Sequence, residues 1–127
     1  MGVIPSFVYI WSNDMTQPMV TVTLTGGQKI DCEVSKHHYR ANKQIALLLS
    51  AANTPYNETS NSFPGEPIGT PTVCLPGYEF GERETAIKDC GEYAGFLGAL
   101  EQAGIVRRTA RTFLGGYISY PVVEVLI

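Results

Sequence analysis

The sequence predicts an α+β protein with a mostly antiparallel β-sheet, one main α-helix packed on one face, and a C-terminal β-hairpin. Two pairs of β-prone runs are each joined by a Gly-Gly pair, at 26–27 and 115–116, which is typical of hairpin turns. One stretch, at about 90–103, has the apolar periodicity of a helix. The length fits a single domain over 1–127, and no internal repeat interrupts it.

The N-terminal part holds an apolar run, then a hairpin. Residues 1–18 contain Phe7–Trp11, which we interpret as either an additional strand or an ordered arm. From Val20 the residues alternate with period two up to the Gly-Gly pair and again over 29–34. We expect the second run to face the core with Ile30, Cys32 and Val34, and to face water with Lys29, Asp31 and Glu33.

The middle of the chain predicts short strands and one long loop. Residues 35–43 are a polar connection, and 44–51 is too apolar on both sides to alternate, which favours a central strand over a short helix. Residues 52–69 are rich in Asn, Thr, Ser, Pro and Gly and predict a long loop, a feature often functional or mobile. Strands are expected at 70–75 and 85–88.

The helix at about 90–103 has start and stop signals. Asp89 and Glu92 have the spacing of a capping box. Gly104 is expected just past the end, with Ile105 packing on Leu100 in a Schellman motif. One apolar stripe follows the helical repeat: Tyr93, Phe96, Leu97 and Leu100.

The same helix carries a strip of small residues: Gly91, Ala94, Gly95 and Gly98. Each glycine inside a helix costs up to about 1 kcal/mol relative to alanine, so close approach of another element is the natural compensation. We favour packing of this strip on the protein's own sheet, and the alternative is docking of a partner protein.

The last hairpin joins 109–114 to 117–127. Pro121 has no N–H, so it belongs on an edge, at a bulge, or where the strand changes partners. Because strand edges pair readily, we also expect a homodimer through the apolar last strand or the first hairpin.

Composition restricts the setting. The net charge of −3 gives no general attraction to nucleic acid or to an anionic membrane. No apolar run is long enough to span a membrane, and the N-terminus lacks the basic region of a secretion signal. The three cysteines (Cys32, Cys74 and Cys90) are odd in number and widely spaced, which predicts reduced thiols. We therefore expect a cytoplasmic protein.

No catalytic or metal-binding signature is present in the sequence. Cys32, His37 and His38 lie close together but lack the paired spacing of structural zinc ligands. Phosphate-binding, dinucleotide-binding and nucleophile-elbow motifs are missing as well. We therefore predict no enzyme activity, no metal and no cofactor.

Charged clusters supply the candidate binding residues. Basic side chains gather in two places, and they suit phosphate contact next to aromatic rings if folding unites them. The alternative is that the first cluster is a solvated connection and that the second supplies the cations usual at a helix C-terminus. Glu79, Glu82 and Glu84 form an acidic face that suits a basic partner protein. The basic and aromatic candidates are Lys36, His37, His38, Arg40, Arg107, Arg108, Arg111, Tyr117 and Tyr120.

From about Asn42 onward the chain resembles a family of small uncharacterised proteins carried by phages and conjugative elements of gut bacteria. The resembling segments are 44–49, 65–67, 72–76, 104–105, Thr109-x-Arg111 and 116–121. The resemblance implies a setting rather than a mechanism. Its typical positions are Thr109, Arg111, Tyr120 and Pro121. An arginine on one hairpin strand near a tyrosine on the next forms either a cross-strand structural pair or a binding site.

These observations predict a non-enzymatic accessory protein of a mobile element that binds a host or element-encoded protein. Inhibition of a host defence system, in the manner of an anti-CRISPR protein, is its sharpest version. The alternative hypothesis is a nucleic-acid-binding module that uses Arg107, Arg108 and Arg111.

Overall fold

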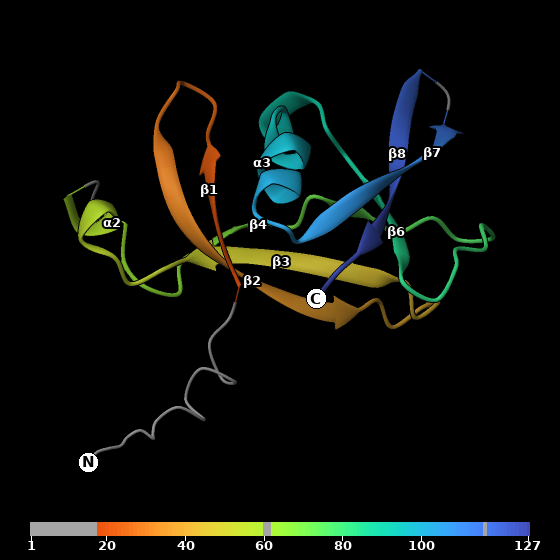
Figure 1. Ribbon diagram of the computed structural model, residues 1–127, viewed down its shortest axis with the longest axis horizontal. Coiled ribbons are helices and arrows are strands. Elements are labelled where there is room, and N and C mark those ends of the chain that lie inside the picture. The colour runs from red at the N-terminus through yellow and green to blue at the C-terminus, as the bar shows by residue number, and fades with distance from the viewer. Residues whose placement is uncertain (1–17, 60–61, 116) are drawn as a thin grey trace, which may run out of the picture.

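The strands form two four-stranded antiparallel sheets (Figure 1). The computed structural model describes residues 18–59, 62–115 and 117–127. The first sheet has the order β1 (Met19–Thr23), β2 (Lys29–His38), β3 (Ile45–Ala51) and β4 (Pro67–Gly69). The second has the order β5 (Thr72–Val73), β6 (Glu84–Ile87), β8 (Ile118–Val125) and β7 (Val106–Gly115).

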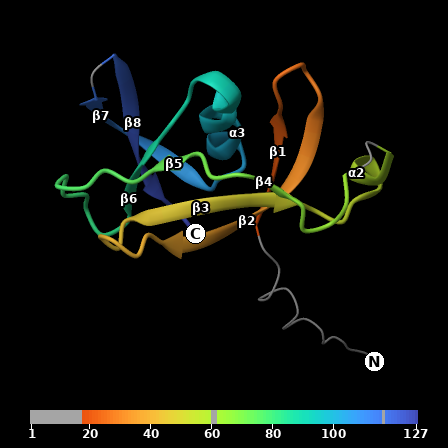
Figure 2. The same ribbon diagram turned by 180° about the vertical axis from the view of Figure 1, so that it is seen from behind.

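One main helix, α3 (Phe96–Gln102), lies between the two hairpins, as both views show (Figures 1 and 2). Its apolar side packs into the core that both sheets share, so the predicted α+β class is confirmed. The central core side chains come from each layer: Val22, Ile30, Cys32, Val34, Leu47, Leu49, Ile87, Phe96, Leu97, Leu100, Ile105, Val106, Val123 and Val125.

The first hairpin forms as predicted, with Val20 opposite Cys32 and Val22 opposite Ile30. These four side chains are buried because period-two alternation turns them all to the core face. Strand β2 continues through His38, and its residues from Cys32 to His38 pair with β3. The expectation of a polar connection starting at residue 35 is therefore wrong, since the ladder with β3 extends the strand past its apolar part.

The apolar segment at 45–51 is a strand, β3, held between β2 and β4, so the helical alternative is wrong. The region 52–69 is not one loop, because it contains α2 (Pro55–Thr59) and β4. Asn57 fixes α2 to β2: its side chain accepts from the Asp31 N–H at 2.9 Å and donates to the Asp31 and Ala52 carbonyls at 2.7 and 2.8 Å. The buried Asn57 side chain thus bonds to the backbone of two other segments, which the sequence alone does not show.

The helical segment is confirmed, but it is split into a 3-10 turn, η1 (Gly91–Tyr93), and α3. The predicted capping box does not form. Asp89 Oδ1 instead accepts from the Gly95 N–H at 2.9 Å. Gly95 has φ 90°, a left-handed conformation that glycine adopts without steric cost, and α3 begins immediately after it.

The end of α3 follows the prediction. The Gly104 N–H bonds to the Glu101 carbonyl and the Ile105 N–H to the Leu100 carbonyl, each at 3.0 Å. These are the two bonds of a Schellman motif, and both Ile105 and Leu100 are buried. The helix therefore ends just before Gly104, as the sequence predicted.

The small-residue strip faces β1 of the protein's own sheet across a cavity of about 470 Å³ that Gly95 and Gly98 line, so it does not make the close contact that we expected. A Cβ added at Gly91, Gly95 or Gly98 would meet nothing within 4 Å. Gly91 and Gly95 have positive φ and shape the turn before α3, which explains them without any neighbour. Only Gly98 lies inside α3, and nothing in the structure explains its choice there.

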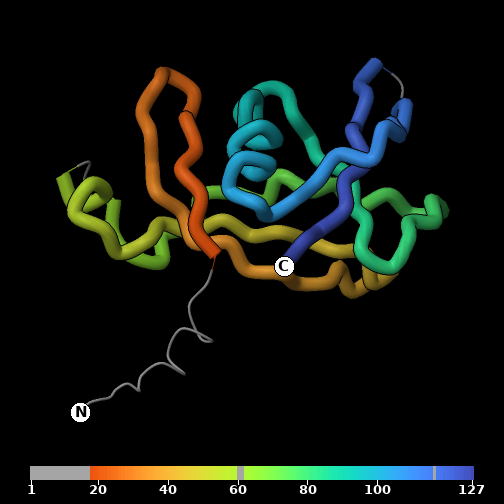
Figure 3. The backbone as a smooth tube through the Cα atoms, in the orientation of Figure 1, coloured from red at the N-terminus to blue at the C-terminus, as the bar shows by residue number. Residues whose placement is uncertain are grey.

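The C-terminal hairpin is confirmed, and it is bulged. Arg108 pairs with Val123 and Thr112 with Pro121, so three residues of β7 oppose Val122 alone. Pairing of β8 with β6 begins at Val122, next to Pro121, which therefore sits both beside a bulge and where β8 changes partners. Figure 3 shows this hairpin and α2 on opposite sides of α3.

Two of our expectations fall outside the described residues. One is the strand or arm within 1–18, of which only Pro18 is described, and the other is the conformation of Gly116 in the last turn.

Candidate interaction site on the C-terminal hairpin

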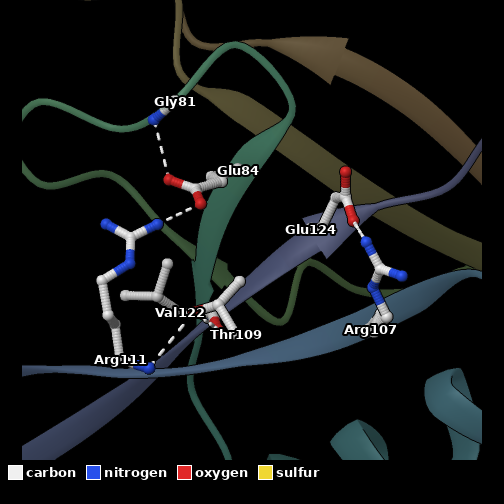
Figure 4. Close-up of polar contacts among 7 residues, drawn as sticks. All are labelled: Gly81, Glu84, Arg107, Thr109, Arg111, Val122 and Glu124. Carbon is white, nitrogen blue, oxygen red and sulfur yellow. Dashed lines mark hydrogen bonds and ion pairs between the residues drawn. The ribbon is translucent and has the colours of Figure 1, made fainter.

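The three arginines of β7 are each paired with a glutamate. Arg107 pairs with Glu124 on β8, and Arg111 pairs with Glu84 on β6 (Figure 4). Arg108 Nε donates to Glu101 Oε1 of α3 at 3.0 Å. The positive cluster that the sequence suggested is thus neutralised by carboxylates that come from three other elements.

The bulge at 109–111 directs Arg111 toward Glu84. Ala110 has φ 73°, an unusual value for a residue with a side chain. Thr109 Oγ1 donates to the Val122 carbonyl at 2.9 Å and accepts from the Arg111 N–H at 3.2 Å (Figure 4). The bulge re-aims one side chain, as bulges beside functional sites do, and it lets a β7 residue reach across β8 to β6.

This network offsets a repulsion between strands. Glu84 and Glu124 lie directly opposite each other on β6 and β8, an arrangement that is destabilising for like charges. Each has its own arginine, and Glu84 also accepts from the Gly81 N–H at 2.8 Å. The hydrogen bond from Arg111, followed by the one from Gly81, holds the pKa of Glu84 below its ordinary value. These contacts therefore hold β6, β7 and β8 together at the base of the hairpin.

Beyond the bulge, aromatic rings line one face of the hairpin. Phe113 packs edge-on against Tyr78, with ring centroids 5.1 Å apart, and stacks with Tyr120 at 6.4 Å. Tyr78 also contacts Phe80 at 4.7 Å. Since Tyr78 and Phe80 belong to the segment before β6, these contacts support the hairpin from its outer side.

The end of the hairpin exposes apolar side chains. Leu114, Tyr117 and Ile118, which we call the tip patch, have relative exposures of 76%, 108% and 39%. Leu114 lies opposite Ser119 and Ile118 opposite Gly115, so these two side chains point to opposite faces of the hairpin end. No charged residue occurs from 112 to 121. Sequence analysis selected Tyr117 and Tyr120 but missed Leu114 and Ile118, because an apolar residue in a strand ordinarily indicates a core position.

The first basic cluster lies on the other sheet. Lys36, His37 and His38 end strand β2, and Arg40 follows in the turn. Lys36 Nζ donates to the Ile127 carbonyl at 2.7 Å, and His37 Nε2 lies 2.9 Å from Ser35 Oγ. Across the described part of the chain, no hydrogen bond or ion pair links this cluster to the arginines of β7. The structure does not unite the two.

The acidic residues border one cavity. Glu79, Glu82 and Glu84 all line a cavity of about 410 Å³ beside Gln44, and Glu84 is in addition paired with Arg111. The Gln44 side chain donates to the Leu75 and Tyr78 carbonyls at 2.8 and 3.0 Å and accepts from the Leu75 N–H at 2.8 Å. The Gln44 side chain therefore holds the segment after β5 through these three hydrogen bonds.

The cysteines have structural surroundings. Cys32 is buried in the core, and desolvation followed by the nearby Asp31 charge raises the pKa of its thiol to about 12. Such a thiol stays protonated at neutral pH and is a poor nucleophile. Cys74 Sγ accepts from Asn42 Nδ2 at 3.3 Å. In residues 18–59, 62–115 and 117–127 no three His, Cys, Asp or Glu side chains are grouped to hold a metal, and no helix there could cross a membrane.

Comparisons with protein-family models, with curated proteins and with solved structures found no match to this chain. The four positions that the sequence analysis predicted to be family-typical have clear structural roles here. Thr109 and Arg111 build the bulge and the pair with Glu84, and Tyr120 and Pro121 lie on the strand facing it. All four belong to the hairpin whose tip is exposed.

Proposed function

We propose that this protein acts by binding another protein, without catalysing a reaction, and that the tip patch is the contact surface. The observation that carries the proposal is the exposure of Leu114, Tyr117 and Ile118 together in an uncharged segment. Exposed apolar side chains occur at protein-binding sites, and tyrosine is enriched among residues that dominate binding energy.

The rest of the hairpin supports this role. The bulge, the pair of Arg111 with Glu84 and the stacked rings of Phe113 and Tyr120 fix the base from which the tip projects. A rigid base lowers the conformational entropy lost when the tip is bound. These contacts therefore fix the position of the base from which the tip is presented to a partner.

The resemblance to proteins of phages and conjugative elements supplies the setting. We propose an accessory protein of a mobile element, acting in the cytoplasm on a host or element-encoded protein. Inhibition of a host defence system, as anti-CRISPR proteins do, is the version with the most direct cellular test. Expression of the wild type would protect an incoming phage from the defence system, and expression of a tip variant would not.

Nucleic-acid binding through Arg107, Arg108 and Arg111 is the weaker candidate, because each guanidinium is already paired with a carboxylate. An incoming phosphate would have to compete with that glutamate. A gel shift at low salt that disappears steeply as salt increases would restore this candidate.

The test is capture of partners from a host lysate by wild type and by Tyr117→Ser/Ile118→Ser. The matched control is Met19→Ser, which removes an apolar side chain of similar exposure (43%) from β1. We expect a partner retained by wild type and by the control and lost with the tip variant. Retention of the same proteins by all three would contradict the proposal.

A further inference from the structure

The distal half of β7 is an open sheet edge. Among the residues that the structure describes, β7 is the last strand of its sheet, and beyond the bulge only β8 pairs with it. In Figures 1 and 2 this end of the hairpin projects away from α3 and from the first sheet. The edge of β1, by contrast, lies along α3, with shared cavities of about 300 and 470 Å³.

The backbone of Thr112 and Leu114 faces outward along this edge. Thr112 pairs with Pro121, which has no N–H to donate, so the pair fits a position where backbone groups point away from the partner strand. The direction alternates with period two, and Leu114 therefore also turns its N–H and carbonyl to the open edge. Phe113, between them, faces Tyr120 in the β8 ladder.

Native proteins guard such edges with charges, prolines or bulges. The proximal half of β7 has three arginines and the bulge. The distal half, from Thr112 to Gly115, has none of these, and Leu114 on it is 76% exposed. An unguarded apolar edge is a site for addition of a further strand.

We propose that this edge pairs with the same edge of a second copy of the chain, antiparallel about a two-fold axis at Phe113. In that register Thr112 lies opposite Leu114 of the second copy, and Leu114 opposite its Thr112. The outward N–H and carbonyl groups of both residues then meet their complements, which satisfies the self-complementarity that a two-fold interface requires. Phe113 faces Phe113 of the second copy as an aromatic cross-strand pair.

Charge favours a second copy as the occupant. Antiparallel pairing about Phe113 places Arg111 opposite Gly115 of the second copy. The arginines of the two chains then lie at opposite ends of the paired segment. Pairing centred on Arg107 and Arg108 would instead bring like charges together. No ionised group is desolvated in the distal segment, since 112–121 is uncharged.

The dimer differs from the one that the sequence suggested. β8 lies inside its sheet and offers no open edge where it pairs with β6, and the first hairpin presents its edge to α3. Pairing through β7 joins two four-stranded sheets into one continuous sheet. Tyr117 and Ile118 then occur twice on it, which doubles the surface available to a larger partner. Because the paired segment is short, the dimer is weak.

The test is sedimentation of the purified full chain from about 10 µM to about 1 mM, a range that covers weak association. We expect the weight-average mass to rise toward twofold for wild type. Leu114→Lys, which places a charge on the edge, would remain monomeric. Met19→Lys, the matched change on the edge of β1, would associate like wild type.

Amide hydrogen exchange gives a second readout that needs no variant. The N–H groups of Thr112 and Leu114 would become protected as concentration rises, while those of Thr21 and Thr23 on β1 would not change. A monomer at every concentration would overturn the inference, as would association that Leu114→Lys leaves intact. Loss of the dimer would leave the proposed function standing if Tyr117→Ser/Ile118→Ser still abolishes capture from lysate.

Discussion

The two hairpins of this protein look alike in sequence and differ in what they do. Each has two β-prone runs around a Gly-Gly pair. The first, β1–β2, buries every inward-facing residue, among them Ile30 and Cys32. The second, β7–β8, buries only its proximal half, and beyond the bulge it exposes Ile118 and its neighbours. A hairpin that extends past its core has apolar residues that the fold does not need.

The largest expected difference lies between two isoleucines. Ile30→Ala should lower the free energy of unfolding by about 2–5 kcal/mol, because it removes buried methyl groups and leaves a cavity. Ile118→Ala should change it by less than about 0.5 kcal/mol, since that side chain is 39% exposed. Urea unfolding of both variants measures the contrast. Equal losses at the two positions would show that the tip belongs to the core.

The next difference concerns alkaline pH. The pKa of Cys32 is raised to about 12, so the folded state keeps its proton where the unfolded thiol has lost it. The stability from this thiol is complete below its unfolded pKa of about 8.5 and is lost as pH rises toward 12. Cys32→Ala should therefore give a flatter decline between pH 9 and pH 11 than wild type. If the stability of wild type and of Cys32→Ala declined in parallel over this pH range, Cys32 would not be the cause of the decline.

A smaller effect is expected at the bulge that divides the second hairpin. Ala110→Gly should stabilise the protein by about 0.5–1 kcal/mol, because glycine adopts φ 73° without steric cost. Thermal unfolding would show a higher midpoint. The control is Ala99→Gly in α3, where the same change should destabilise by about 1 kcal/mol. A lower midpoint for Ala110→Gly would mean that the bulge has another conformation.

The smallest effect is expected at acid pH, and only in the second hairpin. The pKa of Glu84 is lowered by Arg111 and Gly81, so the stability from this carboxylate is present above its unfolded pKa and is lost as pH falls through the lower folded pKa. Arg111→Gln should weaken that acid dependence. Arg108→Gln, which leaves Glu84 untouched, serves as the comparison, and identical acid profiles for the two variants would refute the assignment.

Local patterns predicted the elements with strong period or capping chemistry. Alternation placed Ile30 and Val34 correctly, and Gly104 marked the end of α3. What failed depended on partners that the local pattern does not single out, whether six residues away or 26. Asp89 bonds to Gly95 rather than to Glu92, and Asn57 builds α2 onto β2 from a segment that sequence alone describes as a loop.

The candidate site shows the same division. The sequence predicted the arginines of β7 as a positive patch, but their glutamates lie on other elements, α3, β8 and β6, at separations of 7, 17 and 27 residues. Tyr117 was selected for its place in a basic region, but it lies in an uncharged segment that also exposes Leu114 and Ile118. Alternation shows which side of a strand is apolar, whereas only the fold shows where the core ends.

Photo-crosslinking in host cells tests most directly whether the tip is the contact surface. An aromatic photoreactive residue would replace Tyr117 in one strain and, as control, Tyr56 of α2, which is also exposed at 48%. We predict a light-dependent crosslinked product from position 117, either to a second copy or to another protein, and none from position 56. Products from position 56 alone, or none from position 117, would contradict the assignment of the tip as the site of contact.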